Sequence, residues 1–202
     1  MNSSNPITNP SFRKLFTAQI IALVGTGLST VGLSLLAYNL AGENAGAVLG
    51  IALACKMIAY VFFAPIVGGL VHRFARKPFL ISLDVIRAFL VLLMPFVSEL
   101  WHIYLLIFLL NLFSAGFKPV FQAVIPDILE DDAMYGKALS YSRLAYDLEN
   151  LLSPTFAALA LLFFSYSGLF VGNSVAFVIS AAIIINTTIP VPKPVQRTGN
   201  IW

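Results

Sequence analysis

Seven charged residues lie inside stretches of the sequence that are otherwise apolar, and their side chains are the ones that could do chemistry. They are four bases and three acids: Lys56, Arg87, Lys118, Arg143, Asp84, Asp147 and Glu149. If these stretches cross a bilayer, each charge costs about 2.5–3.5 kcal/mol at the centre of a helix, so it should face a protein interior or a water-filled cavity. Groups in such places carry protons, contact charged solutes, or neutralise one another as ion pairs.

Lys56 and Glu149 are the first candidates for proton coupling or for contact with a solute. Both lie deep in their apolar stretches and belong to separate helices, which is the usual setting of a proton relay. A structural role for this pair has about equal weight. Lys118, Arg143 and Asp147 complete the group of candidates.

Two pairs of charges have helical spacing and invite a structural explanation. Asp84 and Arg87 are three residues apart and therefore lie on one helix face, so we expect a structural ion pair that neutralises both charges. Arg143 and Asp147 are four residues apart, so we expect Asp147 to be paired locally. Glu149 points elsewhere on the same helix and is the better candidate for a proton carrier.

The elements that must position these residues are membrane-spanning helices. Hydrophobic residues make up 59% of the 202 residues and charged ones only 10%, whereas soluble domains carry about a quarter charged residues. The same figures exclude disorder. The apolar stretches are continuous and not alternating, which excludes β-barrel strands. An all-α membrane protein follows.

The lengths of the apolar stretches predict six transmembrane helices, because about 20 apolar residues cross a bilayer. The predicted spans of the bundle at 15–190 are 15–40, 44–71, 79–97, 103–125, 136–164 and 169–189. The first stretch is too long for a cleaved secretory signal. Residues 1–14 form a short segment before the bundle, and residues 191–202 form a polar, proline-containing tail.

The positive charges of the loops predict the orientation of the bundle. The loops and ends on one side collect Arg13, Lys14, Arg73, Arg76, Lys77, Lys137, Lys193 and Arg197, and the turns on the other side collect none. By the positive-inside rule both termini are cytoplasmic. The net charge of +3 is therefore explained by orientation and by contact with membrane lipid, and we expect no nucleic-acid partner.

The loop between the second and third predicted spans carries a recognisable signature. The sequence Gly68-Gly69-Leu70-Val71-His72-Arg73-Phe74-Ala75-Arg76-Lys77 resembles the loop motif Gly-x-Leu-x-Asp-Arg-x-Gly-Arg-Lys of the major facilitator superfamily. The matching residues are Gly68, Leu70, Arg73, Arg76 and Lys77. His72 stands where the motif has Asp, and Ala75 where it has Gly.

A second motif lies in the fifth predicted span. The residues Ser153, Pro154, Ala157 and Ala158 resemble a weakened form of the antiporter motif Gly-Pro-x-x-Gly-Gly. With Asp-x-x-Arg at Asp84 and Arg87 and Pro-Asp at Pro126 and Asp127, the chain is most similar to the bacterial enterobactin-exporter and macrolide-efflux branch of that superfamily. The resemblance covers nearly the whole chain.

The resemblance implies a proton-coupled secondary transporter of the bacterial inner membrane that works by alternating access. In such folds each half consists of two three-helix inverted repeats, and two halves enclose a site near the midplane. This chain has the length of the N-terminal half, with 191–202 as the start of the central loop. Its partners would be protons, a drug-like or siderophore-like solute, and the C-terminal half or a second copy.

Three hypotheses stay open at this point. The chain is one half of an exporter, a half-transporter that acts as a homodimer, or a truncated membrane protein that does not transport. An enzyme is not expected, since no nucleophile, zinc or phosphate-binding motif occurs. We also expect no cofactor and no metal, because His72 and His102 lie at opposite predicted membrane faces.

Overall fold

The computed structural model describes residues 5–129 and 131–190, the side chain of His72 excepted. The expected tail at 191–202, with Lys193 and Arg197, lies outside the described residues. Within them every regular element is helical, and the α-helices are α1 (Pro10–Ala41), α2 (Ala45–Leu70), α3 (Arg76–Leu93), α4 (Leu100–Ile128), α5 (Asp132–Leu161) and α6 (Tyr166–Ile185). Short 3-10 turns flank them: η1 (Pro6–Thr8), η2 (Gly42–Asn44), η3 (Val71–Arg73) and η4 (Met94–Phe96).

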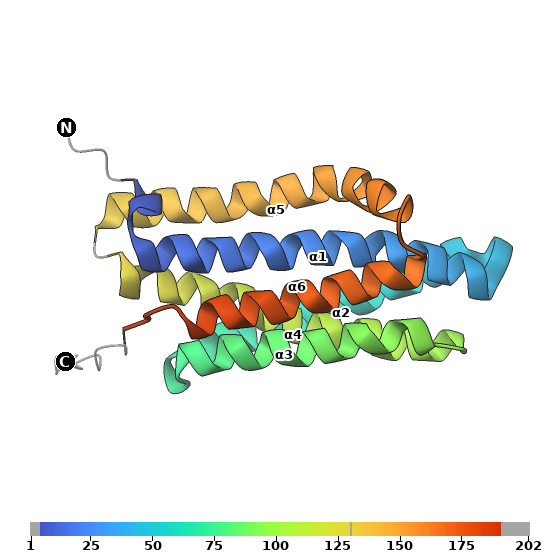
Figure 1. Ribbon diagram of the computed structural model, residues 1–202. Helices are drawn as coiled ribbons and strands as arrows, with labels where there is room; N and C mark the ends of the chain where they lie inside the picture. Colours follow the sequence, from blue (N-terminus) through green and yellow to red (C-terminus); the bar gives the residue numbers. More distant parts are fainter. Residues whose placement is uncertain (1–4, 130, 191–202) are drawn as a thin grey trace, which may run out of the picture.

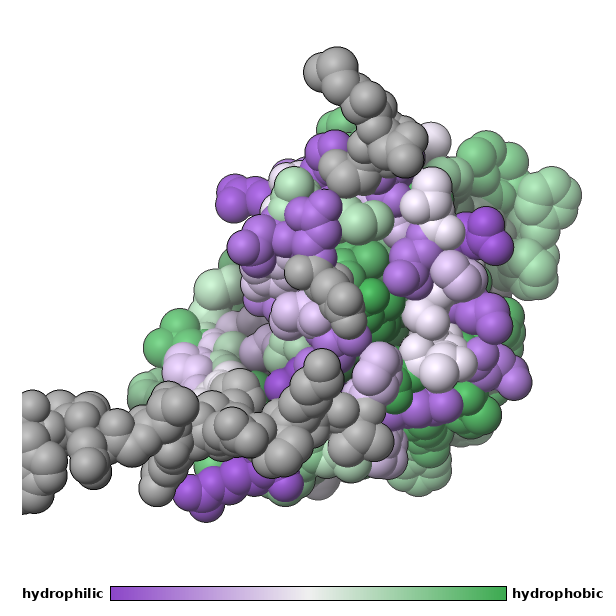
Figure 2. Space-filling model, turned by 90° about the vertical axis from the view of Figure 1, so that its left-hand side faces the viewer, coloured by the Kyte–Doolittle hydropathy of each residue, from purple (hydrophilic) through white to green (hydrophobic). Residues whose placement is uncertain are grey.

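The helices lie side by side in one long bundle, and the links between them alternate between its two ends (Figure 1). The start of α1, the end of α6 and the α2–α3 and α4–α5 links lie at one end, which we call the basic end because Arg13, Lys14, Arg73, Lys77 and Lys137 belong to it. Figure 2 looks at this end, where hydrophilic side chains gather.

Local sequence signals explain where the helices begin and turn. Asn9 caps α1, since its side chain accepts hydrogen bonds from the N–H groups of Ser11 and Phe12 at 2.9 and 3.2 Å, and Pro10 follows at the first helical position. Gly42 ends α1 with a φ of 55°, which suits glycine because it lacks a Cβ. Asp131 caps α5 through the N–H of Ala133 at 2.8 Å.

Four segments are long and apolar enough to cross a membrane: Pro10–Leu70, which contains both α1 and α2, Arg76–Phe96, Leu100–Ile128 and Tyr166–Ile185. The chain is therefore a helical membrane protein. Helix α5 is not among these segments, because Arg143, Asp147 and Glu149 lower its hydropathy. The six-span arrangement and its inverted repeats stay a prediction.

The buried apolar side chains form two clusters along the bundle. The cluster near the basic end contains Phe12, Leu80, Phe121 and Ile184, and the cluster toward the far end contains Leu36, Val48, Met94, Ile103 and Phe170. Between the two clusters several buried residues are polar or charged, namely Gln19 on α1, Asp84 and Arg87 on α3, and Ser180 on α6. The sequence thus places a polar layer in the middle of the bundle.

Candidate functional site

Four of the seven charged residues of the apolar stretches line a cavity of about 300 Å³ between α1, α2, α3, α4 and α5. Lys56, Lys118, Glu149 and Arg87 all line it, together with Gln19, Tyr60, Ser114 and Tyr146. A second cavity of about 290 Å³ continues along α1, α2, α4 and α6, with Ser29, Ser34, Asn111 and Asn173 in its wall. The two cavities share Thr26, Lys56, Tyr60 and Ser114, and we call them together the polar groove.

Three of the expected candidates line this groove and form no ion pairs with one another. Lys56 comes from α2, Lys118 from α4 and Glu149 from α5. In the described part of the chain neither lysine has an acid within the 4.0 Å limit of an ion pair. The ammonium of Lys118 lies 5.1 Å from the centre of the Tyr146 ring, a distance at which a cation is attracted by the ring face.

Asp84 and Arg87 form the ion pair that their spacing predicts, and it is buried. The Ser180 hydroxyl donates a hydrogen bond to the other carboxylate oxygen at 2.7 Å. The Arg87 guanidinium lies between the rings of Phe117 and Phe177, 4.5 and 4.4 Å from their centres. Arg87 therefore reaches the polar groove with its charge already neutralised.

Two buried amides also border the groove. Gln19 is 1% exposed, and its amide nitrogen donates to the Ser142 hydroxyl at 2.7 Å while its carbonyl oxygen has no partner. Asn173 donates in the same way to the Ser29 hydroxyl at 2.7 Å, and its oxygen also lacks a partner. Buried polar atoms are normally satisfied, so both oxygens are unusual: that of Asn173 lies against Gly25 of α1, whereas the Gln19 side chain lines the cavity.

The local ion pair expected between Arg143 and Asp147 does not form among the described residues. Both side chains are exposed on α5, neither lines the polar groove, and they form no ion pair with each other in the part of the chain described. The physical reason is rotation along α5. Glu149 is two residues beyond Asp147 and so faces about 160° away from it, toward α1 and the groove.

The motif Ser153-Pro154-x-x-Ala157-Ala158 turns one side of α5 toward α1. Ser153 and Ala157 are buried, and Pro154 and Ala158 are exposed. A Cβ on Gly27 of α1 would overlap the Ser153 side chain, so the two helices are in close contact there. The small residues of this motif therefore serve helix packing in this chain.

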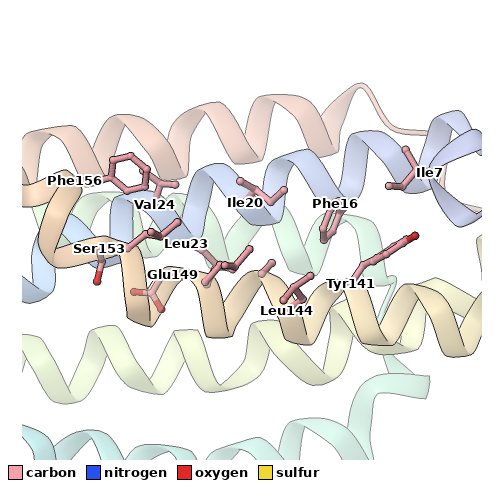
Figure 3. A pocket seen from close by; sticks show the side chains of 13 residues that line it. Ile7, Phe16, Ile20, Leu23, Val24, Tyr141, Leu144, Glu149, Ser153 and Phe156 are labelled. Atoms are coloured by element: carbon pink, nitrogen blue, oxygen red, sulfur yellow. The ribbon is translucent and has the colours of Figure 1, made fainter.

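An apolar groove of about 430 Å³ lies beside the polar groove, between α1 and α5. Figure 3 shows Phe16, Ile20 and Val24 from α1, Leu144 and Phe156 from α5, and Glu149 and Ser153 among them. Glu149 lines both this apolar groove and the polar one. Its carboxylate is thus the only acid bordering either, among the residues described.

The signature loop residues lie at the end of α2, in η3 and in the first turn of α3. Gly68 and Leu70 belong to α2, Arg73 is exposed at the end of η3, and Arg76 and Lys77 begin α3. Arg76 forms an ion pair with Asp127 of α4 and also donates to the Ala123 carbonyl at 2.6 Å. Its side chain therefore links α3 to α4.

Two lysines hold the end of α6 at the same end of the bundle. Lys77 donates to the Ile185 carbonyl at 2.7 Å, and Lys14 donates to the Asn186 carbonyl at 3.0 Å. These carbonyls lie at the C-terminus of a helix, where positive charge is favourable. The signature loop is thus connected to α4 through Arg76 and to α6 through Lys77.

Reasoning from sequence missed several residues of the site. Tyr60, Tyr146, Ser29 and Asn173 line the polar groove, and Asp127 pairs with Arg76. The Asp127 partner lies 51 residues from Arg76, so no local pattern reveals it. The only available signal for the tyrosines was their place on the same helices as Lys56 and Glu149.

Comparisons with known proteins agree on one family. A family model described as Major Facilitator Superfamily matches residues 15–200. Similar relatives include the uncharacterized MFS-type transporter YfiS of Bacillus subtilis, 26% identical over 84% of this chain and 40% of the relative. Multidrug resistance protein MdtG of Enterobacter lignolyticus is 27% identical over 92% of the chain and 43% of the relative. Macrolide efflux protein A of Streptococcus pyogenes is 24% identical over 90% and 44%. The chain spans less than half the length of these relatives.

Proposed function

Because this chain belongs to the Major Facilitator Superfamily, we propose that it is the N-terminal half of a proton-coupled secondary transporter that exports a drug-like or siderophore-like solute by alternating access. The observation that supports this function best is the polar groove. Lys56 and Lys118 are exposed, and Glu149 is half-buried, in this groove on the side of an apolar bundle. Charged side chains in membrane segments normally face a water-filled pathway and not lipid.

The relatives support export as the direction of transport. Two of them are named for multidrug resistance and for macrolide efflux. The tyrosines and phenylalanine of the groove wall, Tyr60, Tyr146 and Phe117, offer aromatic surface of the kind that holds a bulky, partly apolar solute. In this proposal such a solute would meet apolar surface and a few polar side chains on one wall.

The proposed arrangement is a bundle of six spans in the bacterial inner membrane, with α1–α3 and α4–α6 as inverted repeats. The exposed basic residues Arg13, Lys14, Arg73 and Lys137 gather at the basic end, which we place in the cytoplasm with both termini. Labelling of single introduced cysteines from each side of the membrane tests this, and labelling of position 73 from outside intact cells would contradict it.

The groove has one wall in this chain, and transport by rocking needs two. The second wall is the C-terminal half of the same transporter or a second copy of the chain. The alternative is a membrane protein that does not transport and instead regulates a full-length relative. Nothing in the geometry favours that alternative over transport.

Glu149 is the residue that we assign to proton coupling, because it is the one described acid that borders the groove. The test uses inside-out inner-membrane vesicles from cells that produce the chain together with the half that supplies the second wall, energised and loaded with a pH-sensitive fluorescent dye. Adding erythromycin or 2,3-dihydroxybenzoate, one drug-like and one siderophore-like probe, should release protons and restore fluorescence. Glu149→Gln should abolish that response, because an amide cannot carry a proton in exchange.

The matched control is Glu43→Gln, which removes the same charge from the exposed turn η2 and should leave the response intact. An unchanged response in Glu149→Gln would remove Glu149 from the proton path. No response to either probe in the unmodified two-walled transporter would contradict proton-coupled export of these solute classes.

A further inference from the structure

The charges of the polar groove do not balance. Lys56, Lys118, Arg87 and Glu149 are its charged lining residues among those described. Arg87 is neutralised by Asp84 in a buried pair. Two lysines therefore face one carboxylate, and the groove is left with one unneutralised positive charge when all three are ionised.

Neither lysine makes an ion pair or hydrogen bond, among the described residues, that would explain its presence. The structure gives Lys56 no ion pair or hydrogen bond within the residues it describes, and Lys118 only its contact with the Tyr146 ring. Two other basic residues of the bundle do have partners, since Arg76 pairs with Asp127 and Arg87 pairs with Asp84. A lysine in a membrane segment is costly unless it meets an anion, and Glu149 can neutralise only one of the two, so the groove lacks one negative charge that the described residues do not supply.

Gln19 is a third, independent indication that the groove holds a ligand. Its side chain is 1% exposed, lines the cavity, and leaves one amide end without a partner. The Ser142 hydroxyl can donate or accept, so either end of the amide can bond to it and the other end remains for the ligand. Gln19 can thus donate an N–H to a negatively charged or carbonyl oxygen.

We propose that the polar groove binds an amphipathic organic anion. Its negative group would lie between Lys56 and Lys118, and its apolar or aromatic part would lie against Tyr60, Phe117 and Tyr146. This inference rests on the transport function proposed above and names the class of its solute. Glu149 opposes the anion while it is ionised, since like charges repel across an enclosed groove.

Three probes of one shape test the sign of the charge: 4-phenylbutyrate, 4-phenylbutylamine and 4-phenylbutanol. Their binding to the purified chain in phosphatidylcholine nanodiscs is measured by isothermal titration calorimetry, with empty nanodiscs subtracted. The anion should bind about tenfold or more tightly than the cation and the alcohol, as expected for a charge-assisted contact. Lys56→Met and Lys118→Met should each weaken anion binding about tenfold and leave binding of the alcohol unchanged.

The controls separate charge recognition from loss of structure. Arg73→Gln removes a positive charge that is exposed in η3, outside the groove, and should not change anion binding. Glu149→Gln should strengthen anion binding, a gain that an unfolded variant cannot show. Tighter binding of the amine than of the acid, or lysine variants that bind the acid as well as the unmodified chain does, would overturn the inference. The vesicle assay reports transport separately, so either proposal can fail alone.

Discussion

At the scale of single residues, Arg87 shows how a full charge is held inside an apolar bundle. Its guanidinium meets the Asp84 carboxylate, which is 0% exposed, and lies between the rings of Phe117 and Phe177. Ser180 satisfies the second carboxylate oxygen. Three helices therefore contribute to one neutral cluster, and the cost of burying either charge alone is offset by the other.

We expect Asp84→Asn to destabilise the protein strongly. It leaves the Arg87 charge buried without its partner, and breaking a buried pair typically costs about 3–5 kcal/mol. The midpoint of thermal unfolding in detergent should fall well below that of Ser180→Ala, which removes one hydrogen bond worth about 1 kcal/mol.

The double variant Asp84→Asn with Arg87→Met should recover much of the lost stability, because it removes the unpaired charge as well. A double variant that is no more stable than Asp84→Asn alone would show that the ion pair is not the reason for the effect.

At the scale of the helices, α1 packs closely against two neighbouring helices. It packs against α5 and α6 on two of its sides. A Cβ on Gly25 would overlap Asn173 and Ala176 of α6, and a Cβ on Gly27 would overlap Ser153 of α5. Close approach of helix backbones through small residues is the main source of packing energy between helices in a membrane.

Gly27→Ala should therefore destabilise the contact between α1 and α5. Overpacking of a tight contact typically costs about 1–3 kcal/mol, which exceeds the gain of up to about 1 kcal/mol in helix propensity. Gly50→Ala of α2 is the matched control. Apart from the backbone of its own helix and its chain neighbours, no described atom lies within 4 Å of the position that a Cβ on Gly50 would take.

The midpoint of thermal unfolding should fall for Gly27→Ala and stay level or rise for Gly50→Ala. Equal changes in both variants would mean that the α1–α5 contact accommodates the added methyl group without loss of stability.

The helices and their polar residues show which features local sequence can predict. The uncharged stretch from Leu15 to Leu40 lies within α1, but α1 begins at Pro10, because apolar length reports the thickness of the membrane and the Asn9 cap sets the helix start. Spacing predicted the Asp84–Arg87 pair, yet similar spacing does not pair Arg143 with Asp147. Spacing permits a contact, and burial in the folded bundle decides whether it forms.

At the scale of the whole molecule, the polar groove and the apolar surface around it are those of one wall of a larger structure. The exposed large side chains on α2 include Ile51, Met57, Val61 and Phe62, and this helix also borders the groove through Lys56. A surface that joins apolar side chains to an open polar groove suits a second protein wall better than lipid.

We expect a bulky side chain on α2 to block assembly of the two walls. Val61→Trp should abolish the assembled species, whereas Val178→Trp on α6 should leave it intact. Both valines are exposed, 65% and 55%, but Val178 borders the shallow groove between α3 and α6, away from Lys56. Native mass spectrometry of protein released from the membrane measures the mass of the assembled species.

A homodimer would have twice the 22.0 kDa mass of the chain, and another mass would reveal a different partner. A chain that is monomeric both in the membrane and after extraction would contradict the homodimer and leave the C-terminal half of the transporter as the second wall.

The close contacts of α1 also bear on how the protein is made. A ribosome produces α1 first, yet Ser153, Asn173 and Ala176, against which its glycines pack, arrive only after more than 100 further residues. Domains fold as their segments emerge, and contacts distant in sequence form slowly. During synthesis the glycine face of α1 therefore stays uncovered until α6 completes the bundle. Asp84 likewise lacks its hydrogen bond from Ser180 until then.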